Sequence, residues 1–377
     1  MSQFVLQLDL DQVLDAKFQY DYDDLVQYIE ERIKGLGFDT VYVQCTCESE
    51  AELTKGDERV SDYLLFKPVY EIGAAVLNTS LFFDAVTIIR RTQPDIRILA
   101  WAPTLYNKFL LDKGCELVKG IDGNVSWYSR ATPFDPKTYD LLALFYRSLA
   151  AVSPEIDGIM FQDDLVIFDG EDVSQHGLEL INRQYGTELD LGDLVYGYHE
   201  ESPAYYKLIA DKLTNLANHC ILNFKGQYQL SWPSQYRDRV NNTRRALTFG
   251  RDYYDGAALY GQHGTYAGQS LSEAVIYDDI VMMSYFTMST GLAPEDYASV
   301  GAFYKHLVDK TYQALPVGYY PKVVFKIQTV DWSKKDCHIP ADVLKKHVAL
   351  LKAAGAKRIG FYPALMEESL FNPGQSF

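Results

Sequence analysis

The residues best suited to chemistry lie in one short stretch, from Gly158 to Asp172. A brief apolar run ends there in two adjacent carboxylates, Asp163 and Asp164, and more acids follow. Crowded carboxylates resist ionising together, so one can keep its proton near neutral pH while the other stays charged. This pattern suits acid/base catalysis and makes Asp163 and Asp164 the predicted catalytic residues. An acidic loop that caps a helix or holds a cation would have the same pattern, and that alternative stays open.

The overall charge narrows the kinds of partner. The 377 residues carry a formal net charge of −16, and 47% of them are hydrophobic, enough for a large core. A nucleic-acid backbone or an anionic membrane surface would repel such a chain. A cationic or neutral ligand fits better, and we expect neither nucleic acid nor a membrane span among its partners.

The cysteines and histidines argue against a disulfide framework and against a metal site. Five cysteines are an odd number at scattered positions, and the seven histidines occur singly, so we expect no metal and no cofactor. The Gly-x-Ser-x-Gly and Gly-x-Gly-x-x-Gly patterns of serine hydrolases and dinucleotide enzymes are also missing. The sequence enters a strand pattern at Phe4, without a recognisable signal peptide.

Apolar β-rich runs alternate with amphipathic helices along the chain, which is typical of a parallel sheet wrapped by helices. Eight such units predict a single (β/α)8 TIM-type barrel domain over residues 1–377, with long loops after the strands. The predicted strands are Phe4–Leu10, Thr40–Cys45, Ile96–Trp101, Gly158–Phe161, Arg245–Phe249, Ile280–Tyr285, Val323–Val330 and Arg358–Tyr362.

The predicted helices fill most gaps between these strands. They include Leu81–Arg91, Pro136–Ala150, Ser202–Cys220 and Pro294–Leu315, with a weaker candidate at Gln269–Tyr277. Apolar stripes from Leu25 to Leu36 and from Leu344 to Leu351 predict two more. The segments Glu48–Thr79 and Leu222–Asn242 are predicted to be insertions that wall a groove.

Loops after the strands of such a barrel meet at one face, where these proteins do their chemistry. Strand ends commonly carry polar residues, but here acidic and aromatic residues are concentrated together. The residues at the predicted strand ends are Asp9, Asp11, Gln44, Trp101, Asp163, Asp164, Arg251, Asp252, Tyr285, Asp331, Trp332 and Tyr362.

Eight motifs follow one another along the chain: QLDLDQVLD, TVYVQ, ILAWAP, WYSRATPFDP, GIMFQDDLVIFDGEDVS, YDDIVMMSYF, VFKIQTVDW and IGFYP. Their order resembles the glycoside hydrolase domain of the PgaB family, proteins that de-N-acetylate and cleave poly-β-1,6-N-acetyl-D-glucosamine. The resemblance runs nearly from end to end. It implies a (β/α)8 barrel in the periplasm or cell envelope, whose acidic groove takes a partly deacetylated, partly cationic biofilm polysaccharide, and it implies a polysaccharide deacetylase as partner.

Carried over by position, the resemblance places catalysis at Asp163 and Asp164 and sugar-lining rings at Tyr128 and Trp332. Together with the strand-end residues, the predicted substrate-binding set is Asp9, Asp11, Trp101, Tyr128, Gln162, Tyr285, Asp331, Trp332 and Tyr362. The chain departs from the family pattern where it has Gln162 for a His and Lys326 for a Glu. It also has Tyr266 for a Trp, and Ala364 and Leu365 for two acids.

The predicted reaction is endo-acting hydrolysis of a glycosidic bond, with one Asp of the pair as general acid. The second carboxylate stays open among Asp9, Asp11, Asp169, Glu171 and Asp331, and the substrate's own 2-acetamido group is a further alternative. A noncatalytic carbohydrate-binding protein would share the same aromatic and acidic residues, and it is the alternative to an enzyme.

Overall fold

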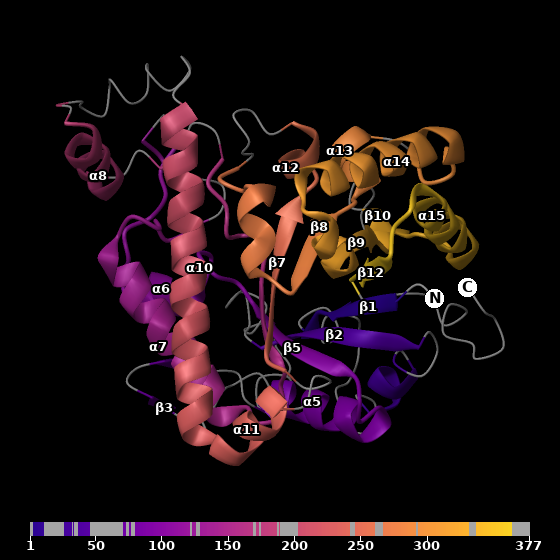
Figure 1. Cartoon of the computed structure of the whole chain (residues 1–377), viewed down its shortest axis with the longest axis horizontal. Coiled ribbons are helices and arrows are strands. Elements are labelled where there is room, and N and C mark those ends of the chain that lie inside the picture. Colours follow the sequence, from indigo (N-terminus) through magenta and orange to yellow (C-terminus); the bar gives the residue numbers. More distant parts are fainter. Residues whose placement is uncertain are drawn as a thin grey trace.

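The eight strands of the computed structural model close into a barrel (Figure 1). Every strand pairs in parallel with its two neighbours, so all eight carboxyl ends lie at one end of the barrel, which we call the mouth. The structure describes residues 3–10, 26–31, 33, 37–45, 71–72, 75–76, 80–120, 123–125, 129–168, 171–172, 175–186, 188, 203–241, 246–260, 267–291, 293–331 and 337–363. The predicted TIM-type barrel is confirmed.

The barrel strands follow one another around the ring in chain order. They are β1 (Gln3–Leu8), β2 (Phe38–Gln44), β5 (Arg97–Ala102), β6 (Gly158–Phe161), β7 (Thr248–Tyr254), β8 (Asp279–Met283), β9 (Val323–Gln328) and β12 (Arg358–Tyr362). Two small antiparallel pairs lie outside the barrel, β3 (Glu71–Ile72) with β4 (Ala75–Val76), and β10 (Val330–Asp331) with β11 (Cys337–His338).

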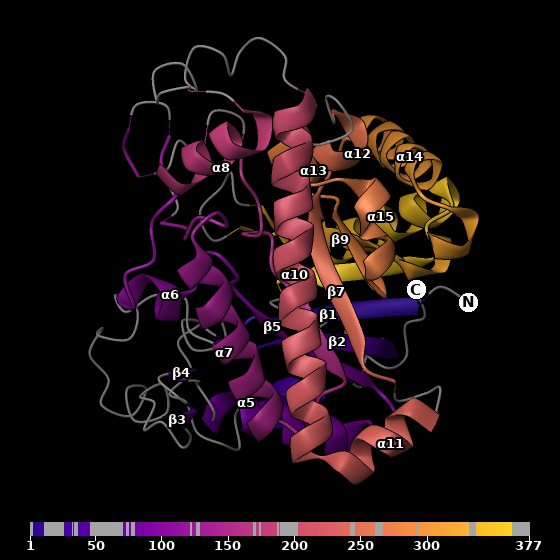
Figure 2. The same ribbon diagram turned by 60° about the vertical axis from the view of Figure 1, so that its left-hand side comes forward.

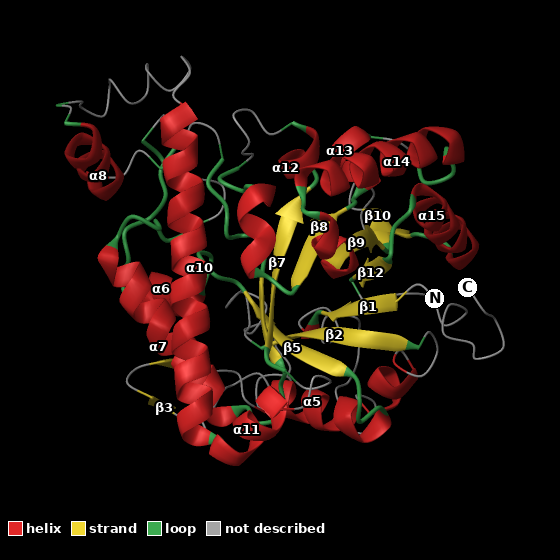
Figure 3. Cartoon of the chain, viewed as in Figure 1, coloured by secondary structure: helices red, strands yellow, loops and turns green. Residues whose placement is uncertain are grey.

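Helices surround the barrel (Figure 3). The longer ones are α5 (Ser80–Thr92), α7 (Pro136–Val152), α8 (Gln175–Tyr185), α10 (Pro203–Ser231), α11 (Pro233–Asn241), α14 (Tyr297–Ala314) and α15 (Ala341–Ala354). Shorter turns are α6 (Lys108–Asp112), α12 (Gly256–Leu259), η1 (Leu271–Ile276), α13 (Phe286–Thr290) and η2 (Val317–Lys322). Within the described residues, no helix combines the length and apolar character needed to cross a bilayer.

The fifth barrel strand differs from its prediction. It runs from Thr248 to Tyr254 rather than from Arg245 to Phe249, so Asp252 lies inside the strand and not after it. Glycine commonly marks the end of a strand, but Gly250 lies inside β7. A larger residue would be crowded there, because its Cβ would lie 2.5 Å from the Met160 sulfur.

The predicted insertion at Leu222–Asn242 is also wrong. Helix α10 continues without a break to Ser231, and α11 follows it. Its buried side chains keep a helical spacing well beyond Cys220, through Phe224 to Tyr228, and the helix packs along α7 outside the barrel (Figure 2). Most of the other predicted insertion, Glu48–Thr79, lies outside the described residues.

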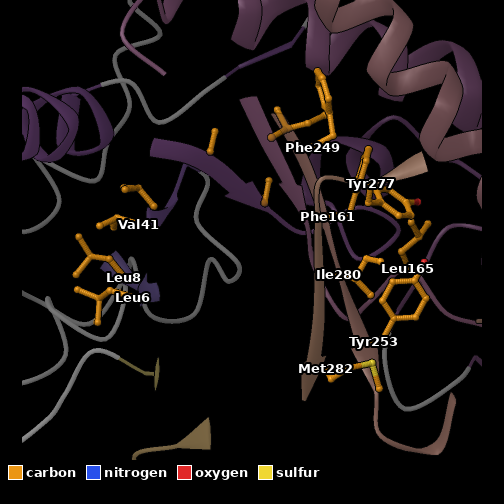
Figure 4. Close-up of a cluster of buried hydrophobic side chains, with 14 of the residues drawn as sticks. Leu6, Leu8, Val41, Phe161, Leu165, Phe249, Tyr253, Tyr277, Ile280 and Met282 are labelled. Atoms are coloured by element: carbon orange, nitrogen blue, oxygen red, sulfur yellow. The ribbon is translucent and has the colours of Figure 1, made fainter. Parts of the chain in front are cut away.

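Two separate apolar clusters hold the fold together. The larger one fills the space between strands and helices, where Phe161, Tyr253 and Tyr277 stack edge to face (Figure 4). The smaller one lies inside the barrel and consists of Val5, Tyr42, Leu99, Trp101, Met160, Val281 and Val324. The mouth therefore has a packed floor, as expected for a barrel of this size.

A buried charge network closes the opposite end of the barrel. Asp279, at the start of β8, accepts hydrogen bonds from Arg97 at 2.8 Å, from Arg358 at 2.6 Å and from the Tyr42 hydroxyl at 2.8 Å. Burial alone would raise the pKa of Asp279, but the two guanidinium groups hold it well below its usual value. This carboxylate therefore ties β2, β5, β8 and β12 together.

Candidate active site at the barrel mouth

Asp163 and Asp164 lie in the turn that directly follows β6. Because the strand has already ended, the two neighbouring side chains have different surroundings. Asp163 is partly exposed, whereas Asp164 is buried. The sequence predicted one catalytic pair, and the structure describes one carboxylate near solvent and one inside the protein.

Asp164 supports the loop that follows β5. Its two oxygens accept the Thr104 N–H at 2.9 and 2.7 Å, and one of them also accepts the Tyr106 N–H at 2.6 Å. Burial raises its pKa to about 6, although these backbone donors favour the charged form. Its contacts are those of a residue that holds two loops together.

Asp163 is the member of the pair that a ligand at the mouth could contact. Burial raises the pKa of its carboxyl, while the charge of Lys326 and a hydrogen bond from the Gln162 amide act in the opposite direction. A partly exposed carboxyl with a raised pKa is able to carry a proton closer to neutrality, as a general acid must.

A buried ion pair lies inside the barrel. The Lys326 ammonium, in the middle of β9, donates to Asp252 on β7 at 2.6 Å and to the Gln7 side chain on β1 at 2.7 Å. Both charged side chains are no more than 2% exposed. Burial raises the pKa of Asp252 to about 6; Lys326 opposes that shift and the nearby Asp163 charge adds to it.

Three aromatic rings come together at the mouth. Tyr285 and Tyr362 are stacked with their centroids 6.3 Å apart, and Trp101 meets Tyr362 edge-on at 6.0 Å. Tyr362 is partly exposed, whereas Tyr285 and Trp101 are buried. Of these three rings, Tyr362 is therefore the one that a sugar can reach without rearrangement.

The remaining predicted acids at the strand ends are largely enclosed. Asp9 accepts a hydrogen bond from the Tyr362 hydroxyl at 3.3 Å and is buried beside it. Asp331 is buried in the short strand β10. Asp9 is thus brought into the same cluster as the rings, and Asp331 lies on the small β10–β11 sheet.

The end of the acidic stretch is fixed by an ion pair. Glu171 accepts two hydrogen bonds from the Arg130 guanidinium at 2.7 and 2.6 Å, and it also accepts the Phe168 N–H at 2.8 Å. Arg130 donates in addition to the Val166 carbonyl at 2.7 Å. Glu171 was a candidate for the second carboxylate, but its contacts are those of a structural residue.

Several predicted positions lie outside the described residues. Among the predicted substrate-binding and second-carboxylate residues these are Asp11, Tyr128, Asp169 and Trp332. The same applies to three departures from the family pattern, Tyr266, Ala364 and Leu365.

The Lys326 network was missed as part of the site. A signal existed, because Lys326 interrupts an otherwise apolar strand, and a charge at such a position must have a partner. The partners could not be identified from the sequence, since Asp252 and Gln7 are 74 and 319 positions away. Within the described part of the chain, no three His, Cys, Asp or Glu residues are grouped closely enough to hold a metal ion.

A (β/α)8 barrel with a partly exposed carboxyl and a partly exposed aromatic ring at its mouth is an architecture that glycoside hydrolases use. The sequence matches the hypothetical glycosyl hydrolase family 13 (GHL13) over residues 7–362. The chain belongs to this family of glycoside hydrolases.

A protein of known description is similar to this chain in sequence. The poly-β-1,6-N-acetyl-D-glucosamine N-deacetylase of Escherichia coli K12 is 22% identical over 371 residues, which cover 96% of this chain. The chain spans about half (50%) of the length of that relative.

Solved structures show the same fold. The glycoside hydrolase domain of PgaB (BpsB) from Bordetella bronchiseptica superimposes with a TM-score of 0.68 at 19% identity, covering 96% of this chain and 94% of that one. The catalytic domain of a β-amylase from Paenibacillus polymyxa gives a TM-score of 0.51 at 10% identity, with coverage of 98% and 94%. At these identities the superpositions support the barrel and not a particular substrate.

Proposed function

We propose that this protein hydrolyses partly de-N-acetylated poly-β-1,6-N-acetyl-D-glucosamine at bonds inside the polymer, with Asp163 as the reacting carboxyl. The observation that carries the proposal is the position of Asp163, which is partly exposed in the turn after β6 at the mouth of the barrel. The similarity to the Escherichia coli protein named for this polymer supports the substrate class. The net charge of −16 suits a ligand that bears free amines.

Asp163 acts as general acid in this proposal and donates its proton to the leaving glycosidic oxygen. The apolar face of a sugar ring packs against Tyr362. Asp9, beside Tyr362, is the described candidate for the second carboxylate, and Asp11, Asp169 and the substrate's 2-acetamido group remain alternatives to it.

The test is incubation with partly de-N-acetylated β-1,6-glucosamine polymer, followed by mass spectrometry of the products. Wild type should release oligosaccharides of several lengths, which indicates cleavage within the chain. Asp163→Asn should release at least about 100-fold less, the usual scale for loss of a general acid. Asp140→Asn, at an exposed position on α7, is the matched control and should behave like wild type.

A noncatalytic carbohydrate-binding protein is the second candidate, and one observation favours it. Asp164, Asp252 and Glu171 all have structural partners, so fewer carboxylates among the described residues are available to form a catalytic pair with Asp163. Binding of the polymer by wild type without any shortened product would decide for this alternative.

The cell envelope is the proposed location, because the polymer is an extracellular polysaccharide. A polysaccharide deacetylase is the proposed partner. The curated relative is named as an N-deacetylase and is about twice as long as the matched region, so a second activity would lie outside the part that this chain resembles. Co-incubation with such a deacetylase should increase cleavage of a fully acetylated polymer.

A further inference from the structure

Two further aromatic rings meet at the mouth of the barrel. Phe168 belongs to the same acidic stretch as Asp163, in the segment after β6, and Tyr254 is the last residue of β7. Their ring centroids are 5.6 Å apart and the ring planes lie at 67°, which is an edge-to-face contact. Both side chains are partly exposed. The cleavage proposed above uses neither ring.

The direction of the Tyr254 side chain follows from the alternation of side chains along β7. The Asp252 carboxylate lies inside the barrel, where it accepts a hydrogen bond from Lys326 at 2.6 Å. Tyr253 points the other way and packs against Tyr277, between the strands and the helices (Figure 4). Tyr254 therefore points to the same side as Asp252, one step nearer to the solvent at the mouth.

The pairing of β6 with β7 places Tyr254 at the same part of the rim as Asp163. Phe161, the last residue of β6, pairs with Arg251. Asp163 and Tyr254 both lie beyond this last pair, on neighbouring strands that are about 4.8 Å apart. A ligand that rests on Tyr254 is therefore at the edge of the mouth from which Asp163 projects.

The backbone that carries the two rings is held in place. The Phe168 N–H donates to Glu171 at 2.8 Å, and Glu171 is itself held by Arg130. The Arg130 guanidinium also lies 5.4 Å from the Phe168 ring centroid, a cation–π contact. The Tyr254 N–H donates to the buried Gln269 side chain at 2.8 Å. Rings that are fixed in this way lose little conformational entropy when a ligand binds.

We propose that Phe168 and Tyr254 form a second sugar-binding platform, which takes the apolar face of a hexosamine ring other than the one that packs against Tyr362. The inference rests on the proposed function for the identity of the polymer. Tyr254 ends β7 and Tyr362 ends β12, with β8 and β9 between them in the ring of strands. We therefore expect separate sugar units to occupy the two platforms. A polymer held at two points favours cleavage at internal bonds over removal of terminal units.

The experiment measures binding of a β-1,6-linked N-acetylglucosamine hexasaccharide by isothermal titration calorimetry. All proteins carry Asp163→Asn, so the ligand stays intact. Phe168→Leu and Tyr254→Leu keep an apolar side chain but remove the ring face, and each should weaken binding about fivefold. Tyr254→Phe keeps the ring and should bind as the parent does. The loss should be smaller for the corresponding disaccharide, which can occupy the other platform.

Tyr319→Leu is the matched control. Tyr319 is also partly exposed, and the Lys322 ammonium lies 4.9 Å from its ring centroid, but it precedes β9 at the far end of the barrel. This variant should leave the affinity for the hexasaccharide unchanged. A general effect of losing a surface ring would lower the affinity here as well.

A second measurement keeps both rings and covers the case in which the Leu variants do not fold. Protein with ¹³C-labelled Phe and Tyr rings is titrated with the hexasaccharide, and the two signals are assigned from Phe168→Tyr and Tyr254→Phe. The Phe168 and Tyr254 ring signals should shift on binding, whereas the Tyr319 signal should not. Ring signals of Phe168 and Tyr254 that stay in place while the ligand binds would contradict the platform.

Unchanged affinity in both Leu variants, or a loss in Tyr254→Phe as large as in Tyr254→Leu, would overturn the inference. In the first case the hexasaccharide still binds, so the proposed polymer stands and only the platform fails. If the parent itself does not bind the hexasaccharide, the proposed polymer fails together with the platform. Binding is measured without turnover, so these outcomes do not depend on whether the protein cleaves the polymer.

Discussion

Both carboxylate oxygens of Asp164 accept the backbone N–H of Thr104, at 2.9 and 2.7 Å. This contact joins the turn after β6 to the loop after β5. It gives Asp164 a different role from its neighbour Asp163, although the two are indistinguishable in the sequence.

Asp164→Asn should therefore lower stability. An amide oxygen accepts less strongly than a carboxylate, and the amide nitrogen would replace one of the two oxygens that accept the Thr104 N–H. We expect a loss of about 1–3 kcal/mol in the free energy of unfolding, measured by urea denaturation. Asp140→Asn, exposed on α7, should change it by less than about 0.5 kcal/mol.

Asp279 and its neighbour Asp278 provide a second matched pair. Asp279→Asn leaves Arg97 and Arg358 without their shared carboxylate and should cost about 3–5 kcal/mol. Asp278 pairs with Lys322 in a partly exposed position, so Asp278→Asn should cost less than about 1 kcal/mol. Equal losses in urea denaturation at pH 7 would contradict the proposed closing role of Asp279.

Asp279 also predicts how acid affects the fold. Its pKa is lowered in the folded protein, so its contribution is fully present above about pH 4, the usual value for an unfolded Asp. That contribution is lost as the pH falls towards the folded pKa. Asp279→Asn should therefore flatten the loss of stability below pH 4, as measured by thermal unfolding at pH 2 to 5.

Asp252 should change stability with pH in the opposite direction to Asp279, because burial raises the pKa of Asp252 to about 6. A carboxyl whose pKa is raised in the folded protein contributes stability that is present below about pH 4 and is lost as the pH rises through 6. The difference of about two units corresponds to at most about 3 kcal/mol. Asp252→Asn should reduce the decline in urea midpoint between pH 4 and pH 7 but not abolish it, because Asp164 shifts in the same direction. A decline as steep as that of wild type would contradict this assignment.

Gly158 permits the close approach of β6 and β7. Its φ is +155°, and a Cβ there would lie 1.6 Å from the Thr248 carbonyl oxygen. Gly158→Ala should therefore cost more than about 4 kcal/mol or prevent folding. Gly226, within α10, has open space at its Cβ, so Gly226→Ala should raise stability by about 0.5–1 kcal/mol. Circular dichroism during thermal unfolding distinguishes the two.

The sequence predicted the barrel well because buried parallel strands are continuous apolar runs, which need no knowledge of their partners. Gly158–Phe161 was predicted with the bounds that the structure gives it. The strand that contains Gly250, Arg251 and Asp252 was misplaced, because residues typical of turns occupy its interior positions.

The site was less predictable for a related reason. The acidic turn follows from a local pattern, but the partners of its members come from distant strands. Asp164 contacts backbone amides about sixty positions earlier in the chain, at separations of 60 and 58, and these cannot be recognised from side-chain types. The contact of Lys326 with Gln7 exists only because the barrel closes.

The charged network around Asp279 and the mouth are kept apart by the packed interior layer that contains Val5, Leu99 and Val324. The barrel is thus anchored at one end and does its work at the other. The buried pair of Lys326 and Asp252 at the working end shares no residue with the anchor around Asp279. Because the two ends of the barrel are separated in this way, a few substitutions at the mouth would change which ligand binds while the barrel still folds in the same way.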